Sequence, residues 1–371
     1  MQQSAQLLSG FLPRLEMQEA QNKLEAFRLF AFVDQELNFP AKRPSLRSMV
    51  SRAQALPPWQ RNFALEGVAH YYTSSAGAEL SLTGLLADPD LPETAMVPMH
   101  AGMGTALAER ALARLGDRPS KEALRGALEG FFELCHTASR PGWHENSMEA
   151  LGLAVRTLHP HLLKRVSAAI GDIEVTTQGG ATQGGATQGG ATHGGTTQGE
   201  AAQRLFWHGV GRSLYFVPMN FLTIGGSHER ALRAAIDEAP TLEDRRNAVA
   251  GLVWAITLVN IRQPAVLRSL LRTCRDIRMP AAVSNGIVSA LMVWKHMAPF
   301  KEEFLVPYLW ILSSMAPDSE LWNELVAIPA AHAFAETLPA LTQPFVPGQP
   351  TVASLFQYRD ADIHPAEVHH I

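Results

Sequence analysis

Apolar side chains recur every three to four residues along most of the chain, which is the spacing of one face of an α-helix. Residues 121–134 (KEALRGALEGFFEL), 228–239 (HERALRAAIDEA) and 243–259 (EDRRNAVAGLVWAITLV) show this pattern clearly. No comparable segment alternates apolar and polar positions as a half-buried strand would. Several helical segments stop at prolines, among them Pro89, Pro92, Pro240, Pro264 and Pro299. The pattern predicts an all-α protein built from short helices.

One stretch interrupts the helical pattern. Residues 176–200 repeat a five-residue unit, T-Q-G-G-A, and contain no large apolar side chain. Such a stretch cannot bury enough surface to offset its ordering entropy, so we expect a flexible linker, with a recognition repeat as the alternative. The linker would join an N-terminal helical half (1–175) to a C-terminal helical half (201–371), and the two halves can pack as one domain.

Glycine recurs inside the expected helices. It lies in an apolar helical context at six places: Gly67, Gly102, Gly152, Gly209, Gly251 and Gly286. The intervals run from 35 to 57 residues, and the longest falls to 32 when the linker is left out. Periods of this length are typical of helix-pair repeats such as HEAT repeats. Because a mid-helix glycine costs about 1 kcal/mol relative to alanine, the six glycines indicate that a neighbouring backbone approaches closely. Chance periodicity in a glycine-rich and alanine-rich chain is the alternative.

The linker divides the six glycine units into three and three. We therefore expect irregular HEAT-like helix-pair repeats. The chain could then consist of two duplicated halves, each with three glycine-bearing units. Under duplication the unit at Gly67 corresponds to the unit at Gly209. The positions one before and three after each glycine share a helix face.

In these two corresponding units that face carries ionisable residues. Glu66 and His70 flank the first glycine, and His208 and Arg212 flank the fourth. Buried charges are unfavourable unless they are paired or hydrogen-bonded. The four groups therefore form structural pairs, line a ligand or catalytic pocket, or face solvent. We favour structural pairing over a pocket, and we expect Glu66 to lie near Arg212 or His208 across the interface between the halves.

Two further groups of residues are candidates for a site. His144 and Glu145 follow a Pro-Gly turn where a loop enters a helix; they could act as an acid–base pair, or Glu145 could simply cap the helix. Aromatic and sulfur-containing side chains near the fourth and fifth glycines would suit an apolar ligand, although ordinary core packing gives the same pattern. These are Trp207, Tyr215, Phe216, Met219 and Trp254.

No cofactor is predicted. Glu133 and His136 have the E-x-x-H spacing of di-iron bundles, but such a site needs a second pair, and the remaining one, Glu367 and His370, lies in the tail. A bound di-iron centre is therefore not expected, and no metal ligands are assigned. The chain also lacks a P-loop, a G-x-S-x-G motif and a complete dinucleotide-binding fingerprint.

Composition excludes several classes of function. The chain has 371 residues and a formal net charge of −4, without a cluster of Lys and Arg among aromatics, so nucleic acid is not an expected partner. The longest apolar run, residues 248–259, is too short to span a bilayer. The N-terminal residues lack the basic start and the apolar core of a secretory signal. The two cysteines, Cys135 and Cys274, are too few for a disulfide framework. We expect a soluble, cytoplasmic protein.

Four phrases taken together resemble a known family. They are FALEGVA, MHAGMGTAL, GWHEN and HGVGRSLYF. In this order they are similar to the pattern of a bacterial family of unknown function whose members occur beside enediyne-type polyketide synthase genes. The resemblance covers about residues 60–290. The chain departs from the pattern at Trp143, at Tyr215 and in the T-Q-G-G-A insertion.

The family pattern matches particular residues of this chain. They are Glu66 and Gly67, then His100, Gly102 and Gly104, then His144 and Glu145, then Gly209, Gly211, Arg212 and Phe216. The resemblance implies a role in specialised-metabolite biosynthesis without assigning a reaction, and it adds His100 to the candidate ligand-binding residues.

Two functional hypotheses remain open. The first is a protein that binds or transforms an apolar, polyketide-type small molecule in a helical pocket; whether it is an enzyme stays undecided. The second is a non-catalytic helical-repeat scaffold for biosynthetic enzymes. A closed apolar cavity of roughly several hundred Å³ reached by the polar pairs favours the pocket. A solid core with an exposed concave face favours the scaffold.

Overall fold

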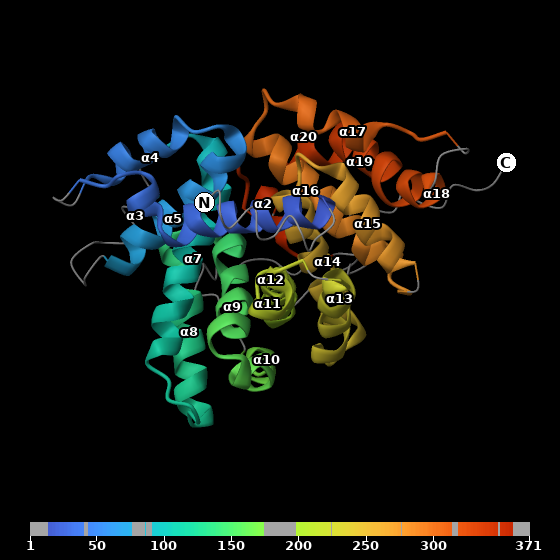
Figure 1. The fold of residues 1–371 in the computed structure, drawn as a ribbon. Coiled ribbons are helices and arrows are strands. Elements are labelled where there is room, and N and C mark those ends of the chain that lie inside the picture. The colour runs from blue at the N-terminus through green and yellow to red at the C-terminus, as the bar shows by residue number, and fades with distance from the viewer. Residues whose placement is uncertain are drawn as a thin grey trace, which may run out of the picture.

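The computed structural model describes residues 14–40, 44–75, 86, 91–173, 198–223, 225–275, 277–313, 318–347 and 349–358 (Figure 1). Within these ranges every regular element is helical and no strand occurs, which confirms the all-α prediction. The predicted linker lies outside the described residues except for its last three, which belong to a helix. The pair Glu367 and His370 also lies outside them.

Six long helices form the centre of the molecule, and each packs against the next in chain order. They are α5 (Pro58–Ser75), α7 (Met96–Ala113), α9 (His144–Leu158), α11 (Gln198–Leu214), α14 (Leu242–Val259) and α16 (Pro280–Met297). Each carries one of the six recurring glycines. In this row α11 follows α9 directly, so the segments on either side of the linker are neighbours in space.

The other elements surround this row. Helix α2 (Arg14–Ala31) packs on α5, α14 and α15 (Pro264–Cys274), whereas α8 (Lys121–Ala138) packs on α7, α9 and α10 (Leu163–Gly171). Helix α13 (Ser227–Glu238) lies against α14, and a group of short helices near the C-terminus covers α16 (Figure 1). The remaining elements are α3 (Val33–Glu36), α4 (Leu46–Gln54), η1 (Glu93–Ala95), η2 (Pro160–Leu162), α10 (Leu163–Gly171), α12 (Pro218–Phe221), α15 (Pro264–Cys274), η3 (Glu302–Phe304), α17 (Val306–Leu309), α18 (Ser319–Trp322), η4 (Asn323–Ala327), α19 (Ile328–His332), η5 (Ala333–Thr337), α20 (Leu338–Leu341) and η6 (Val352–Phe356).

Five of the six recurring glycines lie where two helices of the row cross, and Gly67 lies where α5 crosses α2. A Cβ atom on Gly152 would come 1.9 Å from the carbonyl oxygen of Phe206, and one on Gly102 would come 2.0 Å from that of Glu66. Gly209 and Gly251 meet backbone oxygens of the adjoining helices at 2.0 and 1.9 Å in the same way. The expected close approach of a neighbouring backbone is therefore confirmed. The arrangement as duplicated repeats stays a prediction.

Buried apolar side chains from both sides of the linker form one continuous cluster, from Ala26 to Tyr358. The short helix η6 is part of it: Val352, Ala353 and Phe356 are fully or almost fully buried against α9, α11 and α16. The Tyr358 backbone N–H donates to Asn247 Oδ1 over 2.8 Å, which fixes the end of this segment. Both cysteines are buried and free. Within the described chain, no helix combines the length and the hydropathy needed to cross a membrane.

Shortening the linker is expected to leave the fold intact. A Cβ atom on Gly199 would lie 3.3 Å from the carbonyl oxygen of Ile173, so the chain on the two sides of residues 174–197 is close together. A loop of about six residues can bridge this gap. Replacing 174–197 by six residues halves the loop length twice, which reduces the chain entropy lost on folding and stabilises the protein by roughly 1 kcal/mol. We expect an unchanged or slightly raised melting temperature when 174–197 are replaced by a six-residue Gly-Ser loop. A large fall would show that the segment contributes to the core.

Candidate functional site

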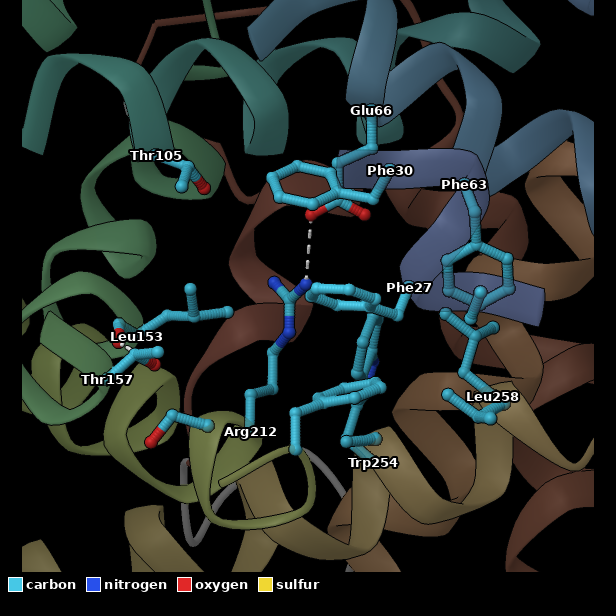
Figure 2. A pocket seen from close by; sticks show the side chains of 15 residues that line it. Phe27, Phe30, Phe63, Glu66, Thr105, Leu153, Thr157, Arg212, Trp254 and Leu258 are labelled. Atoms are coloured by element: carbon cyan, nitrogen blue, oxygen red, sulfur yellow. Dashed lines mark hydrogen bonds and ion pairs between the residues drawn. The ribbon is translucent and has the colours of Figure 1, made fainter. Parts of the chain in front are cut away.

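A cavity of about 180 Å³ lies at the centre of the helical row, with α2 along one side (Figure 2). Its lining is mostly apolar and comes from six helices, α2, α5, α7, α9, α11 and α14, and from Phe216 in the turn after α11. The lining residues are Ala26, Phe27, Phe30, Phe63, Glu66, Thr105, Leu153, Thr157, Arg212, Ser213, Phe216, Trp254, Ala255, Leu258 and Val259. Among them only Glu66 and Arg212 carry ionisable groups. Phe27 is partly exposed and lies where the cavity meets the surface.

These two ionisable groups contact each other. Arg212 Nη2 donates to Glu66 Oε1 over 3.3 Å, and the dashed line in Figure 2 marks this bond. Glu66 belongs to α5 and Arg212 to α11, so the contact joins the two sides of the linker. The prediction that Glu66 lies near Arg212 is confirmed.

A third ionisable residue, Glu149 of α9, completes the cluster. Its carboxylate accepts from Arg212 Nη1 over 2.7 Å through Oε2 and lies 3.0 Å from His208 Nδ1 through Oε1. The side chains of Glu149 and His208 are fully buried, and that of Arg212 is 8% exposed. The Arg212 guanidinium also lies 4.8 Å from the ring centre of Trp254. Arg212 is therefore held in one orientation by α9 and α14.

Burial determines the protonation of this cluster. It raises the pKa of Glu66, and the nearby Glu149 charge acts in the same direction while Arg212 opposes it. Burial also lowers the pKa of His208, so the imidazole stays neutral. For Arg212, burial works against the charge, but the two glutamates outweigh it and raise the pKa. The cluster thus holds one fixed ion pair, Glu149 with Arg212, and one carboxyl group, Glu66, whose pKa lies above its ordinary value.

The hydroxyl groups of the cavity wall are already engaged. Thr105 donates to the Ala101 carbonyl, Thr157 to Leu153 and Ser213 to Val210, at 2.6–3.0 Å. Backbone bonding of this kind leaves these side chains without a general base. Glu66 is therefore the wall's available proton donor or acceptor.

Sequence reasoning missed Glu149. It was not considered, although it lies three residues before Gly152 and its own carbonyl touches Gly209. One signal could have found it. His208 and Arg212 need a carboxylate when they are buried, and the segment MEALGLAV on the neighbouring helix offers a single acid.

The structure places His70 and His100 outside the cavity lining. His70 Nε2 lies 2.9 Å from Glu109 Oε2, and the His70 ring lies 5.1 Å from that of Phe30. The His100 side chain is buried; its Nδ1 lies 2.8 Å from the Met96 carbonyl, and its Nε2 accepts from the Arg140 backbone N–H. Because both ring nitrogens are used within the protein, His100 supports the packing of α7 against the turn before α9.

His144 and Glu145 also lie outside the lining, at the N-terminus of α9. The His144 ring is 4.3 Å from that of His136, and burial lowers the pKa of both histidines. Glu145 accepts from Gln357 Nε2 over 3.4 Å. The structure therefore does not bring this pair together with Glu66 and Arg212.

The five aromatic and sulfur-containing candidates divide into three groups. Phe216 and Trp254 line the cavity. Trp207 and Tyr215 are buried away from it, and Met219 is 75% exposed at the surface.

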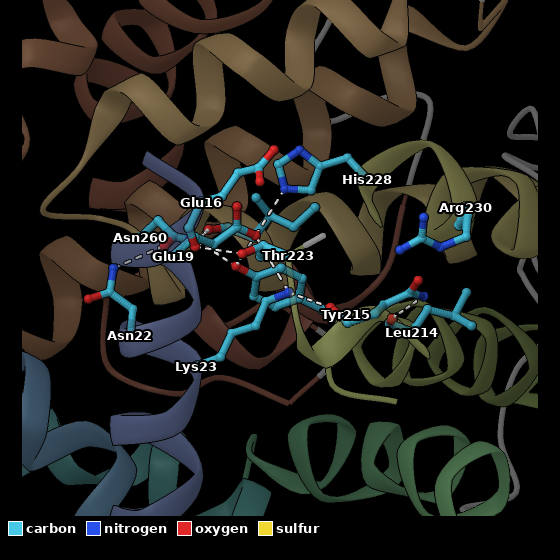
Figure 3. Close-up of polar contacts among 12 residues, drawn as sticks. Glu16, Glu19, Asn22, Lys23, Leu214, Tyr215, Thr223, His228, Arg230 and Asn260 are labelled. Carbon is cyan, nitrogen blue, oxygen red and sulfur yellow. Dashed lines mark hydrogen bonds and ion pairs between the residues drawn. The ribbon is translucent and has the colours of Figure 1, made fainter. Parts of the chain in front are cut away.

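Tyr215 instead belongs to a second polar cluster, which fastens α2 to the row (Figure 3). Its hydroxyl donates to Glu19 Oε1 and accepts from Asn260 Nδ2, each over 2.7 Å. Lys23 donates to the Asn220 carbonyl and lies over the Tyr215 ring, and burial lowers its pKa to about 8. These partners satisfy one another, so the cluster anchors α2 along the cavity.

No group of three or more His, Cys, Asp or Glu side chains in the described residues is arranged to hold a metal ion. Glu133 and His136 both lie on α8, whereas the second E-x-x-H pair falls outside the described residues. The geometry thus offers no reason to assign a metal.

Acid is expected to destabilise the protein through His100. Burial lowers its pKa to about 3 from 6.5. Between these values the unfolded chain binds a proton that the folded chain does not, so stability is full above pH 6.5 and falls toward pH 3. At about 1.4 kcal/mol for each pKa unit, the loss amounts to several kcal/mol. Urea unfolding from pH 7 to 4 should show a shallower fall for His100→Asn than for the wild type; equal slopes would contradict this.

Searches of protein-family models, curated proteins and solved structures found no match to this chain. The site is therefore interpreted from its own geometry.

Proposed function

We propose that the protein binds a small, uncharged and mostly apolar molecule in the central cavity, with one polar atom of the ligand at Glu66 and Arg212. The observation that carries the proposal is an apolar cavity whose ionisable lining is limited to this one contacting pair. Ligand pockets commonly combine apolar walls with few convergent polar groups.

Cavity size limits the ligand. An engineered cavity of about 150 Å³ holds benzene, and this one is about 180 Å³. It is smaller than the several hundred Å³ expected for a pocket that encloses a drug-sized molecule. A molecule with a single ring or two fused rings fits these dimensions. One end of a longer chain that leaves the cavity past Phe27 fits them as well.

Charge limits the ligand further. Arg212 supplies one positive charge, and Glu149 already pairs with it at 2.7 Å. Glu66 adds a second carboxyl group, so the cluster has no excess of positive charge to attract an anion. A neutral carbonyl or hydroxyl group matches the cluster better than a carboxylate or phosphate.

Calorimetric titration tests this function. We expect 1-tetralone, a ketone on two fused rings, to bind, and 1-naphthoate, an anion of similar size, to bind at least tenfold more weakly. Ala255→Leu places three extra carbon atoms in the cavity and should abolish binding. The same change at Ala123, which is exposed on α8, should leave it unaltered. Equal binding to wild type and Ala255→Leu would reject the cavity as the site.

A biosynthetic role is proposed from the family resemblance and from the apolar cavity. The ligand would then be a polyketide-derived ring compound. Deleting the gene from a producing strain and profiling its metabolites tests this role, since an accumulated intermediate would identify the step, and an unaltered profile would argue against it.

A scaffold for biosynthetic enzymes is the second candidate function. One observation favours it: Phe300, Trp310 and Ile311 near the C-terminal short helices are 92%, 63% and 70% exposed. If partners dock there, replacing Phe300 and Trp310 with serine should end co-purification of the partner while 1-tetralone binding is retained. Retained co-purification would reject this surface as the docking site.

A further inference from the structure

We propose that Glu66 acts as a general acid–base on a ketone ligand, removing a proton from the carbon beside the carbonyl group and returning it. This inference rests on the proposed function and names its substrate class, a ring ketone with an enolisable C–H. The ketone oxygen would lie at Arg212 and the adjacent carbon at Glu66.

Glu66 is placed to reach a ligand. Its side chain lines the cavity and is 15% exposed, whereas the Glu149 side chain is fully buried behind Arg212. The two carboxyl groups therefore differ in role. Glu149 orients the guanidinium, and Glu66 faces the space that a ligand would occupy (Figure 2).

Arg212 is held in one orientation but can still donate a hydrogen bond to a ligand. The bond from its Nη1 to Glu149 is 2.7 Å, while the contact from its Nη2 to Glu66 is long, at 3.3 Å. A guanidinium held on one side can donate to a second oxygen from the other nitrogen. A cation fixed before the reaction stabilises negative charge that develops on a carbonyl oxygen.

Nucleophilic catalysis by a hydroxyl or thiol group lacks the necessary groups among the lining residues. The lining contains no Cys, Lys or His, and its three hydroxyl groups donate to backbone carbonyls, so no nucleophile is paired with a base. Proton transfer at carbon needs only a base and an oxyanion donor. Burial raises the pKa of the Glu66 carboxyl group above its ordinary value, which favours a group that both takes and returns a proton.

The step is balanced without any other reactant. The Glu66 carboxylate takes the proton, the C–H electron pair becomes the new C=C bond, and the carbonyl π electrons move to the oxygen, which Arg212 stabilises. Return of a proton from Glu66 restores the ketone. A ligand with a neighbouring double bond would receive the proton at the far carbon and emerge as an isomer.

Hydrogen–deuterium exchange measures this step directly. In D2O, loss of the 1-tetralone α-CH2 signal in proton NMR should be at least 100-fold faster with the protein than with buffer. Glu66→Gln keeps an oxygen for Arg212 and should bind 1-tetralone as the wild type does, with exchange at the buffer rate. Glu129→Gln, the same change at an exposed site on α8, should exchange like the wild type.

Glu66→Asp provides a second test should Glu66→Gln fail to fold. It retains the acid but withdraws it by one methylene group, so exchange should fall about tenfold or more. Binding of 1-tetralone to the wild type without accelerated exchange would overturn the acid–base role and leave the proposed function standing. Full exchange by a folded Glu66→Gln would do the same. Absence of binding to the wild type would overturn both.

Discussion

Arg212→Met is expected to lower the free energy of unfolding by about 3–5 kcal/mol, because it leaves a buried carboxylate without its counter-ion. Glu149 is fully buried and pairs with Arg212 at 2.7 Å, and its other oxygen faces only a neutral His208. The methionine fills the space of the guanidinium stem but donates no hydrogen bond. Chemical denaturation at pH 7 measures the loss.

Two companion variants separate pairing from general damage. Removing both charges, in Arg212→Met with Glu149→Leu, should restore much of the stability, because the fully buried Glu149 carboxylate is then removed together with its counter-ion. Arg233→Met breaks an exposed pair with Glu229 on α13 and should cost less than about 1 kcal/mol. If Arg212→Met instead keeps wild-type stability, the cluster is solvated and the structural role assigned to Glu149 is wrong.

Gly152→Ala is expected to destabilise the protein by about 3 kcal/mol or more, the upper range for overpacking of a tight core. The added Cβ would lie 1.9 Å from the Phe206 carbonyl oxygen, so α9 and α11 must separate. Since Glu149 and Arg212 lie on these two helices, 1-tetralone binding should weaken as well.

Gly126→Ala is the matched control. Gly126 is also inside a helix, α8, but a Cβ there meets nothing within 4 Å. The same substitution should stabilise the protein by about 0.5–1 kcal/mol through helix propensity alone. Similar losses of melting temperature in the two variants would contradict the assignment of Gly152 to a backbone contact.

The recurring glycines were informative because a glycine inside a helix indicates that the backbone of a neighbouring helix lies close to it. A mid-helix glycine has no local advantage, so its presence at Gly152 or Gly209 points to a crossing helix, and the crossing brings residues one turn away into contact. That reasoning led from Gly67 and Gly209 to the contact between Glu66 and Arg212. The all-α class was identified separately, because the hydrophobic period and the helix-breaking residues agree along most of the chain.

Hydrophobic periodicity could not find the cavity wall. From Leu205 to Leu214 every residue of α11 is buried, so no polar face shows which side points inward. Trp207 and Tyr215 were therefore grouped with Phe216, although they face other helices. Phe27 and Phe30 were missed because α2 carries none of the recurring glycines, and its role depends on the tertiary contacts of Glu19 and Lys23 with Tyr215 and Asn220.

The central claim is that the cavity beside Glu66 and Arg212 is a ligand site, and a crystal structure with 6-bromo-1-tetralone tests it most directly. The anomalous signal of bromine locates the ligand independently of any interpretation of its shape. We expect one bromine peak among Phe27, Phe63 and Trp254, with the ketone oxygen near Arg212. A bromine peak only at the surface, with the cavity empty at saturating ligand, would contradict it.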